Sequence, residues 1–180
     1  TKENGLFTLI TDNGEKHISK TIIMANGGGI ISPQKLDIEG ASKYELTNLH
    51  YTVQRIERFK DKHVLISGGG NAAIDWAAEL LHVAESVTVI YRKDELTAHE
   101  AQIKILRENH VEIILNATIN SLVANKENHT IDQVIVEING DNRAIAVDEV
   151  LINHGYNREA SLEFKEGLQP EMKDDYYYIG

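Results

Sequence analysis

Three consecutive glycines, Gly68-Gly69-Gly70, stand between a short apolar run and a segment with helical periodicity, and they constrain the fold more than any other feature. Together with Ala73 they form the pattern G-x-G-x-x-A. The first glycine of this pattern permits a tight turn, the next lets an anion approach the backbone, and the small alanine lets the helix pack close to the strand. The first amides of the helix then face the anion. We expect a phosphate-binding turn, and a structural glycine turn without a ligand is the alternative.

The segments around this turn alternate between strand and helix patterns. Strands are expected at 62–67, 86–91, 111–115 and 149–153, and helices at 71–84 and 98–109. This order predicts parallel strands joined by right-handed crossovers. Three further strand-like runs, at 118–124, 130–138 and 143–147, predict an inserted antiparallel β-meander. The expected fold class is therefore α/β, with a Rossmann-like parallel sheet of the three-layer ββα type.

The N-terminal part has a different pattern. Strands are expected at 6–11 and 17–25, and Asp12-Asn13-Gly14 between them is typical of a hairpin turn. A second triplet, Gly27-Gly28-Gly29, precedes Ile30-Ile31-Ser32-Pro33, where no helix can open because the residue before a proline is pushed to extended geometry. We interpret this triplet, on the residues alone, as a flexible or close-packed turn.

The residues at the end of the second parallel strand favour a phosphorylated coenzyme. An Asp or Glu there would bind the ribose 2′-hydroxyl of NAD, but the chain has Tyr91-Arg92-Lys93 instead. Arg92 can meet a 2′-phosphate with a bidentate fork, and Lys93 adds a point charge. Tyr91 could stack on the adenine. We therefore expect NADP(H), and the alternative is a solvated Arg–Lys pair neutralised by Asp94 and Glu95.

Composition narrows the functional classes. The chain has 180 residues, a formal net charge of −10 and no Cys. The acidic balance disfavours nucleic acid, whose binding requires a basic patch, and no apolar run approaches the roughly 18 residues of a membrane span. Without Cys there are no disulfides or zinc–thiolate sites. His154 and Gly155 lie at the end of the last parallel strand, where ligands gather; the other histidines show no metal-ligand spacing.

Several stretches resemble a known family. Ile66–Ala77 and Val87–Asp94 are similar to the NADPH domain of thioredoxin-reductase-like flavoproteins. The ferredoxin (flavodoxin)–NADP reductase branch of that family is resembled by Pro33-x-x-Leu36 with Gly40, by Asn48–Tyr51 and by Ala98–Glu100. The resemblance covers essentially the whole chain.

The resemblance implies a set of cofactor contacts. For NADP(H) the implied residues are Gly68, Gly69, Gly70, Asn71, Ala72, Tyr91, Arg92, Lys93 and Gly155. For FAD they are Ala25, Asn26, Gly27 and Ile31, where the family's chain returns beside the flavin. Two positions depart from the family pattern, because Tyr91 replaces the usual His and Thr97 replaces a further Arg. No catalytic acid or base is expected, since the flavin carries the chemistry.

The resemblance also predicts how the chain is organised. The Cys-x-x-Cys pair of thioredoxin reductases and the two flavin-binding motifs of the family are missing, so we expect no dithiol chemistry and a piece of a longer protein. The expected domains are 43–155 for NADP(H), beginning in a polar linker at 41–60, and 1–42 with 156–180 as portions of a flavin domain.

The function that the resemblance implies is hydride transfer between NADPH and FAD, with electrons passing to ferredoxin or flavodoxin. The implied setting is a cytoplasmic homodimer without nucleic-acid or membrane partners, and this piece alone is expected to be inactive. The alternatives are a non-catalytic NADP-sensing module, another thioredoxin-reductase-like enzyme without the dithiol, and a methyltransferase. The methyltransferase is disfavoured, since an acidic residue should stand where Arg92-Lys93 are found.

Overall fold

The computed structural model describes residues 1–23, 30–125, 127, 129–159, 168, 172–173 and 176–177. Contacts within the chain divide it into two compact units, Pro33–Asn157 and a smaller one made of Thr1–Ser32 and Arg158–Gly180. Strands β4 (Ile30–Pro33) and β13 (Tyr156–Glu159) pair as a two-stranded sheet. The assignment of 1–42 and 156–180 to a flavin domain, and of 43–155 to an NADP(H) domain, stays a prediction.

The smaller unit contains the predicted hairpin. The hairpin is formed by β2 (Leu6–Ile10) and β3 (Lys16–Ser19). β1 (Lys2–Glu3) pairs with the other edge of β2, which completes a three-stranded antiparallel sheet. A separate antiparallel pair consists of β14 (Met172–Lys173) and β15 (Tyr176–Tyr177). Gly14 in the turn has φ of 85°, a conformation that glycine adopts without steric cost. β3 ends at Ser19, earlier than the predicted strand over 17–25.

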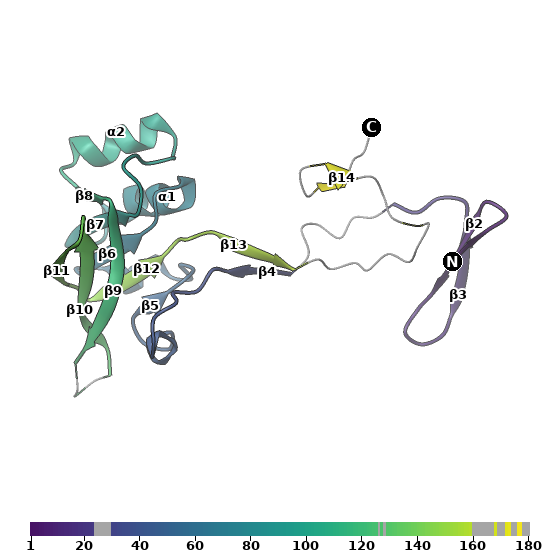
Figure 1. Cartoon of the computed structure of the whole chain (residues 1–180), viewed down its shortest axis with the longest axis horizontal. Coiled ribbons are helices and arrows are strands. Elements are labelled where there is room, and N and C mark those ends of the chain that lie inside the picture. The colour runs from purple at the N-terminus through teal and green to yellow at the C-terminus, as the bar shows by residue number, and fades with distance from the viewer. Residues whose placement is uncertain are drawn as a thin grey trace. The chain divides into compact units, whose positions relative to one another are not determined.

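A five-stranded parallel sheet lies at the centre of the unit Pro33–Asn157 (Figure 1). In spatial order its strands are β5 (Leu49–His50), β12 (Glu149–Ile152), β6 (His63–Ser67), β7 (Ser86–Tyr91) and β8 (Glu112–Leu115). Every neighbouring pair is parallel. β12, the last of the five along the chain, is inserted between β5 and β6, so that Leu151 is opposite both His50 and Ile66.

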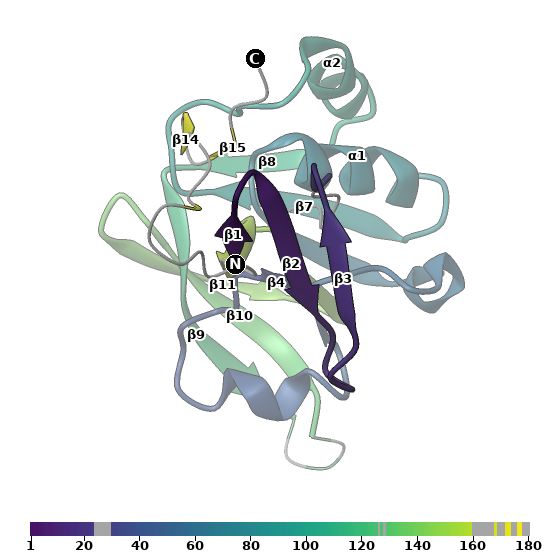
Figure 2. The same ribbon diagram turned by 90° about the vertical axis from the view of Figure 1, so that its right-hand side faces the viewer.

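Helices cover one face of this sheet and a second sheet covers the other (Figure 2). The helices are α1 (Asn71–Leu80) and α2 (Glu100–Glu108), and the second sheet contains β9 (Ala117–Ala124), β10 (Ile131–Ile138) and β11 (Asp141–Ala146) in antiparallel order. The predicted α/β class with an inserted antiparallel meander is confirmed. Among the described residues, no helix combines the length and apolar character that a membrane crossing requires.

Alternation along the central strands creates two apolar cores. In β6, Val64 and Ile66 pack with Ile74 of α1, whereas Leu65 between them packs with Val134 of the antiparallel sheet. Successive side chains of a strand point to opposite faces, so a continuous apolar run such as Val64–Ile66 fills both cores. Each fully buried side chain of this size contributes about 1.5–3 kcal/mol of burial free energy. This packing holds the carboxyl end of β6 in a fixed position.

The stretch 41–60, expected to be a linker, is packed within this unit and contributes the buried residues Ala41, Asn48, Leu49 and Phe59. It contains two 3-10 turns, η1 (Ala41–Tyr44) and η2 (Ile56–Phe59), and the short strand β5 between them. The buried Asn48 side chain donates from Nδ2 to the carbonyls of Ile131 at 2.8 Å and Asp148 at 2.7 Å. Its Oδ1 accepts from the Ile131 amide at 2.8 Å. Asn48 therefore joins β5 to the rest of the unit.

Candidate functional site

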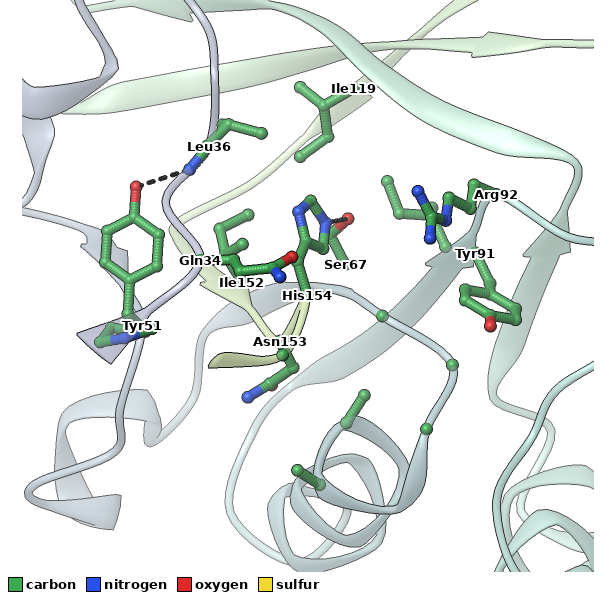
Figure 3. Close-up of a pocket in the computed structure, with 18 of the residues that line it drawn as sticks. Gln34, Leu36, Tyr51, Ser67, Tyr91, Arg92, Ile119, Ile152, Asn153 and His154 are labelled. Carbon is green, nitrogen blue, oxygen red and sulfur yellow. Dashed lines mark hydrogen bonds between the residues drawn. The ribbon is translucent and has the colours of Figure 1, made fainter. Parts of the chain in front are cut away.

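A cavity of about 580 Å³ lies at the carboxyl ends of β6, β7 and β12 (Figure 3). Its walls are Pro33–Asp37, Tyr51, Ser67–Ala73, Ile90–Arg92, Thr97, Ala117–Ile119 and Ile152–Tyr156. The carboxyl edge of a parallel sheet, beside the strand where the connections reverse direction, is where α/β proteins bind their ligands. The predicted glycine turn, Arg92 and Gly155 thus line one cavity.

The glycine turn at the start of α1 is closely packed on β12. Gly68 has φ of 153°, and a Cβ there would stand 2.5 Å from the Asn153 carbonyl oxygen and 3.0 Å from Cβ of Ala73. Gly70 has φ of −89°, and the nearest atom to a Cβ there would be Oγ1 of Thr97 at 4.0 Å. Gly68 is therefore required by the fold, whereas Gly70, which also lines the cavity, has room for a Cβ.

The turn presents four consecutive backbone amides, those of Gly69, Gly70, Asn71 and Ala72. The described residues supply no acceptor for any of them, although the amides on either side are bonded. Gly68 donates to the Ile90 carbonyl at 3.0 Å, and Ala73 donates to the Gly70 carbonyl at 3.1 Å. Unpaired amides at a helix N-terminus, reinforced by the helix dipole, make an anion site.

The loop after β7 fastens the turn in place. The Thr97 amide donates to the Gly69 carbonyl at 2.8 Å, and the Thr97 hydroxyl donates to the same oxygen at 3.3 Å. The His99 amide donates to Oδ1 of Asn71 at 2.9 Å. The Gly69 carbonyl is thereby committed to Thr97, while its amide stays free. These contacts join residues about 28 positions apart, so the sequence alone gave no sign of them.

The two predicted cations are placed differently. Arg92 lines the cavity and Lys93 does not, because the chain bends after Tyr91 at the end of β7. The Lys93 carbonyl accepts from the Asn116 amide at 3.0 Å. In the described part of the chain, no salt bridge links this Arg–Lys pair to a carboxylate. The guanidinium of Arg92 is therefore available to an anionic ligand.

His154 lies in the same cavity, on β12's side of it. Its Nε2 is 2.8 Å from the Ser67 hydroxyl oxygen, at the end of β6. Partial burial of the ring, and to a smaller extent the charge of Arg92, lowers the pKa of His154 below its ordinary value of 6.5. The ring is therefore neutral near pH 7. The neighbouring Oδ1 of Asn153 is buried without a partner among the described residues.

The far end of the cavity consists of residues from the irregular segments. The Leu36 amide donates to the Tyr51 hydroxyl at 3.1 Å, and the Gln34 amide donates to the Gly155 carbonyl at 2.9 Å. Burial raises the pKa of Tyr51 above 10.0. Gln34 and Tyr51 were missed as site residues, since these segments carry no periodic pattern; the resemblance of Pro33–Leu36 and Asn48–Tyr51 was the only signal.

The predicted flavin contacts mostly fall outside the described residues. Ala25, Asn26 and Gly27 are not described, and Ile31 is described only as part of β4, without its side chain. Their role toward FAD stays a prediction.

The arrangement fits a phosphorylated dinucleotide. The four free amides suit a pyrophosphate, and the guanidinium of Arg92 beside them suits a further phosphate. The fold and this turn are typical of dinucleotide-binding α/β proteins. The sequence profile described as pyridine nucleotide-disulphide oxidoreductase matches residues 1–178, and the chain belongs to that family.

Curated relatives share this sequence at high identity. Ferredoxin–NADP reductase 3 of Lysinibacillus sphaericus is 52% identical over 99% of this chain and 52% of its own length. Ferredoxin–NADP reductase 2 of Exiguobacterium sibiricum is 51% identical over 98% of this chain and 51% of its own length. The chain thus spans about half the length of the curated relatives it matches.

Solved structures share the fold. Thioredoxin reductase of Lactococcus lactis superposes with a TM-score of 0.74 at 24% identity, over 97% of this chain and 58% of that one. Thioredoxin reductase of T. acidophilum gives a TM-score of 0.74 at 23% identity, over 89% of this chain and 52% of that one. The predicted likeness to the thioredoxin-reductase-like fold is confirmed.

Proposed function

We propose that the unit Pro33–Asn157 binds NADP(H) as part of a flavoprotein oxidoreductase. The observation that carries this proposal is the row of free amides at Gly69–Ala72 with Arg92 beside it in one cavity. The pyrophosphate accepts hydrogen bonds from these amides, and Arg92 binds the 2′-phosphate. Gly155 and Tyr91 complete the walls, and Lys93 contributes a longer-range positive potential.

The preference for NADP(H) over NAD(H) comes from Arg92. A hydrogen bond to a charged group contributes about 1.5–3 kcal/mol, and the exposure of Arg92 places it toward the low end of that range. No carboxylate lines this part of the cavity wall at Tyr91–Arg92 to bind a ribose 2′-hydroxyl instead. The 2′-phosphate therefore has a partner here, and the unphosphorylated ribose does not.

The reaction of the whole protein is also part of the proposal. The curated relatives are named ferredoxin–NADP reductases, which supports hydride exchange between NADPH and FAD, with ferredoxin or flavodoxin as the electron partner. The chemistry that FAD supplies when bound is hydride acceptance and one-electron release. The role of the described residues is to bind and orient the nicotinamide coenzyme, and we assign no acid or base among them.

Calorimetric titration of the chain with NADPH and NADH tests the proposal, with Arg92→Ala and Lys93→Ala as a matched pair. We expect the wild-type chain to prefer NADPH by about tenfold or more, which corresponds to about 1.4 kcal/mol. Arg92→Ala should remove most of this preference, and Lys93→Ala should reduce it only slightly. Equal binding of both coenzymes by the wild-type chain would refute the assignment to NADP(H).

A further inference from the structure

The His154 ring occupies the middle of the cavity, away from the residues assigned above to the phosphates. Figure 3 shows the ring between Ser67 and Gln34, with Arg92 beyond Ser67. One ring nitrogen, Nε2, is turned toward the Ser67 hydroxyl at 2.8 Å. The other, Nδ1, is turned toward the side of the cavity where Gln34 lies, and the described residues supply no partner for it.

The bond to Ser67 determines which ring nitrogen carries the proton. Ser67 is buried, and its hydroxyl has no acceptor in the described part of the chain other than Nε2 of His154. If Nε2 donated instead, the hydroxyl hydrogen would be buried without an acceptor, which costs free energy. Ser67 therefore donates to Nε2, and the neutral ring carries its proton on Nδ1. His154 thus offers one hydrogen-bond donor to the cavity.

The position of this donor indicates which part of the coenzyme it meets. With the 2′-phosphate on Arg92 and the pyrophosphate on the amides of Gly69–Ala72, the adenosine half occupies the Arg92 end. The remaining half must extend past His154 toward Gln34 and Tyr51, since these residues line the rest of the cavity. Oxygen atoms of the second ribose and of the nicotinamide carboxamide are the acceptors available there.

We propose that His154, held by Ser67, donates a hydrogen bond from Nδ1 to the nicotinamide-nucleotide half of NADP(H). The proposal rests on the proposed function and adds a binding residue, His154, and a positioning residue, Ser67. His154 binds the reactive half of the coenzyme, and Arg92 binds the other half. Ser67 acts through His154, because its bond to Nε2 fixes the proton and the orientation of the ring.

Two ligands separate the halves experimentally: NADP⁺, and adenosine 2′,5′-bisphosphate, which lacks the nicotinamide nucleotide. His154→Gln keeps a polar atom near the Nε2 position but removes the Nδ1 donor. We expect it to weaken NADP⁺ about tenfold, the effect of one hydrogen bond, and to change bisphosphate binding by less than twofold. His154→Asn, which keeps a donor near the Nδ1 position, should lose less NADP⁺ affinity. Ser67→Ala should weaken NADP⁺ about threefold and leave bisphosphate binding unchanged.

The same titrations distinguish a failure of the inference about His154 from a failure of the NADP(H) assignment. Arg92→Ala should weaken both ligands, whichever residue binds the nicotinamide half. If Arg92→Ala weakens both ligands but His154→Gln weakens neither, or weakens both equally, the inference about His154 is overturned and the NADP(H) assignment stands. If the wild-type chain binds neither ligand, both proposals are overturned. Thermal unfolding of each variant before titration verifies that it is folded.

Discussion

The ring of Tyr91 lies directly on the backbone of Gly69, so a Cβ built at Gly69 would stand 2.3 Å from Cδ1 and 2.4 Å from Cγ of the ring. This contact explains why the middle glycine of the triplet, for which the G-x-G-x-x-A pattern gives no reason, has to be a glycine. It also links the phosphate-binding turn to the strand end that carries Arg92.

Gly69→Ala should therefore disturb both folding and binding. The added methyl group displaces either the Tyr91 ring or the turn, and overpacking of this kind costs about 1–3 kcal/mol of unfolding free energy. NADPH affinity should fall with it. In the Tyr91→Ala background the ring is gone, so adding Gly69→Ala should cost little further unfolding free energy in urea. The coupling free energy of the double-mutant cycle should therefore offset most of the cost of the methyl group. Strictly additive losses would show that the ring and the turn do not interact.

Gly70→Ala provides a matched comparison one residue away. Its backbone is extended, and the nearest atom to an added Cβ is 4.0 Å away, so the fold should accept the methyl group. Stability should stay the same or rise by about 0.4–1 kcal/mol, because the unfolded chain loses freedom. NADPH affinity should nevertheless fall, since the methyl group stands where an anion approaches the amides. Urea unfolding measures the effect on stability, and calorimetry on the same sample measures the effect on NADPH affinity. An unchanged NADPH affinity would contradict the assignment of the glycine turn as the phosphate-binding site.

Asn48→Ala should destabilise the unit Pro33–Asn157 strongly. The variant loses three hydrogen bonds, two of them to the buried backbone groups of Ile131 and one to the part-buried carbonyl of Asp148. We expect a loss of about 2–4 kcal/mol in urea unfolding. Leu46→Ala is the control, because that side chain is 94% exposed and its loss should change stability by less than about 0.5 kcal/mol. A loss at Asn48 as small as the control's would show that the polar network contributes little.

The lowered pKa of His154 predicts how stability depends on pH. In the unfolded chain the ring titrates near 6.5, whereas burial and Arg92 hold the pKa in the folded chain below that value. As pH falls through 6.5, the unfolded state takes up a proton that the folded state does not, so this group's contribution to stability is present above 6.5 and is lost at lower pH. Wild-type and His154→Gln chains unfolded in urea at pH 7.5 and 5.5 test this. The wild type should lose more stability than the variant on acidification, and equal losses would contradict the assignment.

The central part of the fold was predictable from sequence because its signals are local. The strand before Gly68, the helix after it and the alternation of elements up to Leu115 all follow from residues within one turn or one strand of each other. The glycine pattern then identified the cavity side of the sheet. These features need no knowledge of distant partners, and the structure confirms the elements.

The remainder depends on contacts between distant residues. β5 has two residues and is a strand because it pairs with β12, which lies far along the chain, and Asn48 beside it bonds to groups 83 and 100 positions away. Residues 41–60 therefore show no strand pattern of their own. From the sequence, Arg92 and Lys93 were both predicted to meet the 2′-phosphate. In the structure, only Arg92 of the two lines the cavity. Residues Ala117–Ile119 line the cavity because β9 begins beside it, which no motif indicated.

The insertion of β12 between β5 and β6 has a consequence for how the protein is made. A nascent chain that has left the ribosome up to β8 can pair β6 with β7 and β7 with β8, but the edge of β6 that will receive β12 is still open. The Ser67–His154 bond, which joins residues 87 positions apart, has to wait for the end of β12. Closing such a long loop is slow, and the unpaired backbone edge of β6 is exposed to other chains in the meantime. Productive folding of the unit Pro33–Asn157 therefore depends on a strand near the C-terminal end of that unit.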